Sequence, residues 1–160
     1  MDLSFTWKEW DEGAVGPEAV AAQAEAFLRA GDLCLQDRDN GERSVPMVIP
    51  AVVNWCLSIE LYLKALIFND GRRAGQIHRL DRLFELLAAA DREAIEQAWT
   101  PLVATLSLPG LLREVGGYFV DVRYDYEVAE RAYSEGAIRL ALTAITAAVK
   151  ETIWRDGPLP

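Results

Sequence analysis

The chain has very little histidine and cysteine. Its 160 residues include one histidine, His78, and two cysteines, Cys34 and Cys56. One histidine and two scattered cysteines are too few for a zinc site, which takes three or four clustered ligands. Both cysteines lie in apolar helical stretches, where free thiols are usually buried. We therefore expect two buried free thiols, no metal and no cofactor.

Basic residues are also scarce. The chain has 16 Lys and Arg against 25 Asp and Glu, a net charge of −9. An acidic surface repels phosphate backbones, which argues against broad DNA binding but leaves room for a small local basic site. The first residues (MDLSFTWKEW) lack the basic-then-apolar pattern of a signal peptide, so we expect a cytoplasmic protein.

Common catalytic motifs are absent from the sequence. It contains no glycine-rich phosphate loop, no G-x-S-x-G, no H-E-x-x-H and no paired-cysteine motif. A long segment with strand periodicity is also missing, and the best β candidate, residues 118–126, is weak. The 51% hydrophobic content and 26% charged content are those of a folded chain, and the length is that of one domain.

The most apolar stretch, residues 45–69, is the element around which the chain is organised. Its polar interruptions are Asn54, Ser58, Glu60 and Lys64. In a membrane span Glu60 and Lys64 would lie near the bilayer centre, where a charged residue costs roughly 2.5–3.5 kcal/mol. A helix that is apolar on nearly all sides is otherwise the centre of a bundle. We therefore predict a buried central helix and no membrane span.

Other segments with helical periodicity surround this one. We expect them at about 17–35, 79–90, 91–105 and 110–121, with a last helix that starts between 127 and 134. Short connections between five or six helices predict an all-α, single-domain, up-and-down helical bundle. Residues 1–16 would form an N-terminal arm and residues 17–156 the bundle.

Periodicity also predicts how several side chains are oriented. Asp81 should point outward from its helix, while Leu102 and Leu106 should point inward from the next. Asp91 is a plausible N-cap for that second helix.

The first polar constellation lies on the central helix. Glu60 precedes Lys64 by four residues, the favoured order for a helical ion pair. The pair can lie at the rim of the core, or Glu60 can be partly buried and hold a cation from another segment, with Arg123 as the candidate. The predicted structural polar network comprises Asn54, Ser58, Glu60, Lys64 and Glu127.

The second constellation is a basic loop after the central helix. Arg72, Arg73 and His78 lie within seven positions. Arginine offers a planar fork of donors to phosphate, and histidine is a general acid or base near neutral pH. The structural alternative is a solvated loop in which His78 caps the next helix through Asp81 or packs on Leu83.

The third constellation is RYDYE at residues 123–127. Its arginine can stack on an aromatic ring or bind a carboxylate, or it can pair structurally with Glu60 or Glu127. The predicted ligand-binding residues of the second and third constellations are Arg72, Arg73, His78, Arg123, Tyr124 and Tyr126.

Three stretches together resemble a known family. They are NWCLSIELYLK at 54–64, HRLDRLFELL at 78–87 and FVDVRYDYE at 119–127. With the final long helix they resemble the HEPN (higher eukaryotes and prokaryotes nucleotide-binding) family, in its bacterial stand-alone branch, over about residues 45–152. The resemblance implies a helical bundle that often forms a homodimer.

Many HEPN proteins are metal-independent RNases with an arginine a few residues before a histidine on a late helix. This chain departs from that pattern, because no histidine follows Arg123. Arg73 and His78 have the required spacing but follow the central helix instead. The segment that starts at His78 looks more like the structural histidine of this branch.

Three functions are therefore open. The favoured hypothesis is a non-catalytic HEPN-like domain that dimerises and binds a nucleotide, RNA or protein partner. The second is a metal-independent endoribonuclease of toxin or defence type that uses Arg73 and His78. The third is a ligand-free helical interaction protein.

Overall fold

The computed structural model describes residues 16–36, 47–100, 102–103, 106–121 and 134–155. These residues form six helices and no strand, which confirms the all-α bundle. The helices are α1 (Pro17–Cys34), α2 (Val48–Asn69), α3 (Leu80–Leu86), α4 (Ala89–Trp99), α5 (Leu108–Asp121) and α6 (Glu135–Thr152). The predicted arm lies almost wholly outside the described residues, and its boundary with the bundle stays a prediction.

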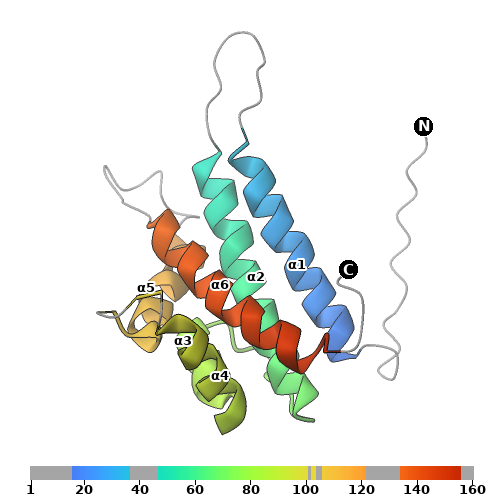
Figure 1. Ribbon diagram of the computed structural model, residues 1–160. Helices are drawn as coiled ribbons and strands as arrows, with labels where there is room; N and C mark the ends of the chain where they lie inside the picture. The colour runs from blue at the N-terminus through green and yellow to red at the C-terminus, as the bar shows by residue number, and fades with distance from the viewer. Residues whose placement is uncertain (1–15, 37–46, 101, 104–105, 122–133, 156–160) are drawn as a thin grey trace, which may run out of the picture.

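Three long helices form the body of the molecule, and three shorter ones pack beside it. α1 and α2 run antiparallel along each other, and α6 crosses α2 (Figure 1). Of the shorter helices, α3 packs against α5 and α4 packs against α6. The basic loop at residues 70–79 therefore joins the end of the central helix to the group of short helices.

The central position of α2 is confirmed. α2 is long and apolar enough to cross a membrane, but 67% of its most apolar window is buried inside the bundle. Because its apolar residues face nearly every direction, the helix must be covered by neighbours on several sides. α1, α3, α5 and α6 provide that cover. Its largest fully buried side chains are Trp55, Ile59, Tyr62, Leu63, Leu66 and Ile67.

Small residues let α1 approach α2 closely. Gly31 faces the Trp55 ring, and a Cβ added there would lie 2.5 Å from ring atoms. The indole N–H of Trp55 donates to Asp32 Oδ1 at 3.1 Å, and the Arg139 guanidinium lies 4.6 Å from the ring centroid. This contact joins α1, α2 and α6 around one buried aromatic side chain.

The boundaries of α3 and α4 differ from the predicted ones. The helix predicted at 79–90 ends at Leu86, because Ala88 is extended (φ −58°, ψ 151°) and α4 begins at Ala89. Asp91 consequently lies inside the first turn of α4 and is not its N-cap. It is 9% exposed, and burial together with the Asp70 carboxylate raises its pKa.

Three orientation predictions were wrong. Leu102 and Leu106 are exposed, because α4 ends at Trp99 and no helix carries them inward. Asp81 points into the protein instead of outward, and only 4% of the residue is exposed.

Cys56 is a buried free thiol as predicted, and burial raises its pKa to about 12, whereas the free thiol of Cys34 is only half-buried.

The last helix follows its prediction closely. Its N-cap is Ser134, whose hydroxyl accepts from the Ala137 backbone N–H, so α6 starts one residue beyond the predicted range. Ile138, Leu142, Ile145 and Val149 are buried along one stripe.

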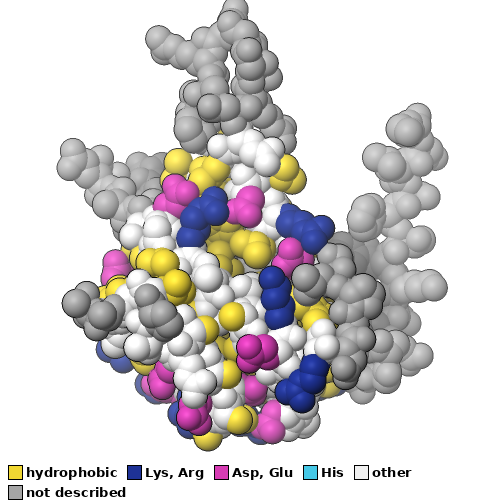
Figure 2. Space-filling model, in the orientation of Figure 1, with side chains coloured by type: hydrophobic (Ala, Val, Ile, Leu, Met, Phe, Trp, Pro, Cys, Tyr) yellow, Lys and Arg dark blue, Asp and Glu magenta, His cyan; other side chains and the backbone are white. Residues whose placement is uncertain are grey.

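On the face in Figure 2, acidic and basic side chains are interspersed among apolar ones, without a large area of one charge.

Candidate functional site

The site is built around the loop between α2 and α3. Gly71 (φ 74°) and Gly75 (φ 57°) occupy the left-handed backbone region that glycine adopts without strain. They turn the chain twice within five residues. These turns place Arg72 and Arg73 between them, and His78 just beyond.

A single buried carboxylate anchors this loop to the central helix. Glu60 Oε1 lies 2.9 Å from Lys64 Nζ and 3.0 Å from His78 Nδ1. The predicted Glu60–Lys64 pair is therefore present, and the group from another segment that lies against Glu60 is the imidazole of His78. A histidine whose Nδ1–H donates to a carboxylate keeps Nε2 as an acceptor. The His78 side chain is 64% exposed, so that acceptor is accessible to a ligand.

The first cleft beside the loop, here called the arginine cleft, has a volume of 350 Å³ and opens against α1 and α2. Arg72 donates to Asp70 at 2.6 Å, and the Arg73 guanidinium lies 3.6 Å above the centre of the Phe68 ring. The lining residues include three cations and no carboxylate: Val20, Gln23, Leu61, Lys64, Phe68, Arg72, Arg73, Ala74 and Gly75. This composition suits an anion attached to an apolar or aromatic group.

The second cleft, here called the histidine cleft, has a volume of 530 Å³ and lies between the end of the loop and α3. It combines His78 and two arginines with the exposed apolar side chains of Ile77 and Leu86. One carboxylate, Glu85, offsets part of that positive charge. The lining residues are Gln76, Ile77, His78, Arg79, Arg82, Glu85 and Leu86.

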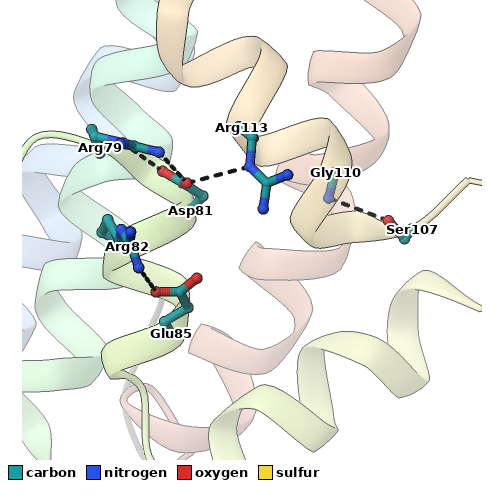
Figure 3. A network of polar contacts seen from close by, with 7 residues as sticks. All are labelled: Arg79, Asp81, Arg82, Glu85, Ser107, Gly110 and Arg113. Carbon is teal, nitrogen blue, oxygen red and sulfur yellow. Dashed lines mark hydrogen bonds and ion pairs between the residues drawn. The ribbon is translucent and has the colours of Figure 1, made fainter.

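Asp81 forms an ion-pair cluster with Arg113 and with Arg79, which also lines the histidine cleft (Figure 3). Its carboxylate accepts two hydrogen bonds from Arg79, at 3.1 and 2.6 Å, and Arg113 Nε on α5 lies 3.6 Å away. The bonds from Arg79 lower the pKa of Asp81, against the opposing effect of burial, and Arg113 adds to the lowering. The cluster ties α3 to α5. The sequence did not predict this cluster, because the helical periodicity placed Asp81 on the polar face of its helix.

A third cleft, between α4 and the start of α5, has the opposite charge. It is lined by Glu85, Glu93 and Glu96 with one cation, Arg92. Three carboxylates repel phosphate, so this cleft is a poor site for a nucleotide. Among the described residues, no group of three or more His, Cys, Asp or Glu side chains is placed to hold a metal ion.

The structure separates several residues that the sequence grouped together. Arg72 and Arg73 line one cleft and His78 the other. Asn54 donates to the Pro50 carbonyl, and within the described part of the chain the buried Ser58 hydroxyl has no hydrogen-bond partner. The remaining candidates fall outside the described residues: Arg123, Tyr124, Tyr126 and Glu127.

Some cleft residues were not among the sequence candidates. Phe68, Arg79 and Arg82 line the two clefts beside the predicted residues. The spacing of Arg79 and Arg82, three positions apart, was the available signal, since such residues are neighbours on a helix surface.

Comparison with known protein families supports the resemblance seen in the sequence. The HEPN domain model matches residues 50–152, which extend from the first turn of α2 to the last residue of α6 and include the basic loop. Neither the curated proteins nor the solved structures gave a match. The matched region covers well over half of the chain, and the chain therefore belongs to the HEPN domain family.

Proposed function

We propose that this chain is a non-catalytic HEPN domain that binds the phosphate of a nucleotide or of RNA in the arginine cleft. The observation that carries the proposal is the lining of that cleft. Lys64, Arg72 and Arg73 line it, and no carboxylate does so among the described residues, in a protein of net charge −9. A local cationic cleft on an acidic protein attracts a small anion without promoting general binding to nucleic acid.

The cleft can also recognise the base of a nucleotide. Arg73 is stacked on Phe68, so its guanidinium plane covers the ring and presents its other face. Bases stack on such guanidinium planes as well as on aromatic rings. Arg73 would therefore contact the base, while Arg72 and Lys64 contact the phosphate.

Binding without cleavage is favoured by the separation of the two candidate catalytic residues. Arg73 and His78 line different clefts, so they do not face one reacting phosphate. General acid–base chemistry needs the histidine within hydrogen-bond reach of the reacting atom, with the charge-stabilising group beside it. Self-association into a homodimer is part of the proposal and is tested by the mass in solution.

The binding experiment is fluorescence anisotropy with a labelled nucleoside monophosphate. We expect Arg72→Ala and Arg73→Ala each to weaken binding about tenfold, the loss typical of one charge-assisted contact. Arg92→Ala is the matched control, because Arg92 is a cation in the acidic cleft. Equal affinities for the wild type and the Arg72 and Arg73 variants would refute the proposed site.

A second function, metal-independent RNA cleavage, is favoured by one observation. Glu60 holds His78 Nδ1 at 3.0 Å, an arrangement that orients a histidine for general-base chemistry. The test is incubation of a mixed RNA pool, without added metal, with the wild type and with His78→Ala. Cleavage that is lost in the variant would replace the non-catalytic proposal, and no cleavage by either protein supports it.

A further inference from the structure

We infer that the arginine cleft and the histidine cleft are adjacent subsites for successive nucleotides of one single-stranded oligonucleotide. This inference rests on the proposed function and names its ligand more closely. The two clefts lie close together. Lys64 lines the arginine cleft and His78 lines the histidine cleft, and their side-chain nitrogens lie 2.9 and 3.0 Å from the same oxygen of Glu60. A short ligand can therefore contact both clefts.

Both clefts have the chemistry that a nucleotide requires. Their volumes of 350 and 530 Å³ are in the range of small-molecule sites. The arginine cleft pairs its cations with the Phe68 ring. The histidine cleft pairs Arg79, Arg82 and His78 with Ile77 and Leu86, which are 36% and 37% exposed. Each therefore offers donors for a phosphate and an apolar surface for a base.

Glu60 connects the two subsites physically. The same oxygen, Oε1, accepts from Lys64, which lines the arginine cleft, and from His78, which lines the histidine cleft. Because one buried carboxylate contacts both groups, the positions of the Lys64 ammonium and the His78 imidazole relative to each other are set before the ligand arrives. Such preorganisation favours a ligand that contacts both groups at once.

The remaining charges favour a short single strand over a duplex. The acidic cleft lies next to the histidine cleft, and Glu85 lines both. A duplex would bring many phosphates against the carboxylates of that surface, while two or three nucleotides would contact only the two subsites. The bases of a single strand are also free to enter clefts, which paired bases are not.

The test compares 5′-phosphorylated mono-, di- and trinucleotides, with ribose and with deoxyribose, by competition in the anisotropy assay. We expect the dinucleotide to bind at least about tenfold more tightly than the mononucleotide, because the second contact is intramolecular. Tighter binding of the ribose series would identify RNA as the ligand. Equal affinity for the ribose and deoxyribose series would show that the sugar does not contribute to recognition. Either result supports two subsites.

Variants of the histidine cleft separate this inference from the proposed function. Arg82→Ala should remove most of the dinucleotide advantage and leave mononucleotide affinity unchanged. Among the described residues that line this cleft, Glu85 is the only carboxylate, so Glu85→Gln should strengthen dinucleotide binding. Both side chains are more than half exposed, so the variants are expected to fold. Circular dichroism checks this.

The possible failures are distinguishable. Equal affinity for mono- and dinucleotides, or an equal effect of Arg82→Ala on both, would overturn the two-subsite inference and leave the arginine cleft as a nucleotide site. No binding of any oligonucleotide or nucleotide would overturn the proposed function as well.

Discussion

Glu60 and Asp81 are both buried carboxylates that contact the basic loop, through His78 and Arg79, but their other partners differ. Asp81 is held by two guanidiniums, from Arg79 before α3 and Arg113 on α5. Glu60 is held by the ammonium of Lys64 on its own helix and by the imidazole of His78. The side chains are similarly buried, at 5% and 9% exposure. Burial alone therefore does not distinguish a structural carboxylate from one that serves a site.

The difference lies in what each carboxylate holds in place. Asp81 accepts two hydrogen bonds from the Arg79 guanidinium, the strongest kind of side-chain ion pair, and a single ion-pair contact at 3.6 Å with Arg113 joins α3 to α5. Glu60 instead contacts Lys64 and His78, which line different clefts. We propose that Asp81 mainly contributes stability and that Glu60 mainly positions the groups of the proposed binding site. The predictions below test this contrast.

The largest effect is expected at Asp81. Asp81→Ala should lower the free energy of unfolding by about 2 kcal/mol, since it removes two hydrogen bonds to a charged group from a buried site. Urea denaturation followed by circular dichroism measures the change. Glu85→Ala is the control, because the exposed Arg82–Glu85 pair should contribute less than about 1 kcal/mol. Equal losses in the two variants would contradict a structural role specific to Asp81.

The same cluster should make the free energy of unfolding depend on pH in the acidic range. Because the pKa of Asp81 is lowered in the folded protein, its contribution is complete above the ordinary aspartate pKa of about 4. The contribution is lost as the pH falls from that value through the lowered one. The stability difference between wild type and Asp81→Asn should therefore be constant from pH 7 to about 5 and shrink below about 4. Denaturation curves at several pH values measure it, and a difference independent of pH would remove Asp81 as its source.

Glu60→Gln should weaken ligand binding more than it lowers stability. The amide retains an acceptor for Lys64 and His78 but loses the charge, so we expect a stability loss of about 1 kcal/mol. Dinucleotide binding should weaken about tenfold, because the Lys64 and His78 side chains lose their fixed orientation. Anisotropy and urea denaturation of the same preparation give the two values. A large stability loss with unchanged binding would assign Glu60 a purely structural role.

The smallest effect is the direct coupling between Glu60 and His78. His78 is largely exposed, so solvent screens the interaction, and a double-mutant cycle with Glu60→Gln and His78→Gln should give a coupling energy of about 0.2–1 kcal/mol. Thermal or urea unfolding of the four proteins provides the cycle. Additive losses would mean that the 3.0 Å contact does not hold the loop in solution.

The sequence alone determined the elements with strong periodicity. The central helix is apolar on nearly every side, and the last helix has a single stripe through Ile138, Leu142 and Ile145, so both were predicted correctly. The Glu60–Lys64 pair was also predictable, because residues four apart on a helix are neighbours whatever the fold. Such features depend only on local geometry.

The tertiary structure decided which distant groups meet. Asp81 is buried because α5 brings Arg113 to it, and no pattern in the sequence of α3 indicates that approach. His78 pairs with Glu60, eighteen residues away, instead of the Asp81 or Leu83 beside it. Arg73 and His78 have the spacing of a catalytic pair but line different clefts, because the loop turns between them at Gly75. Spacing along a chain fixes distances within a helix, whereas contacts across a turn depend on how the packed helices direct the backbone.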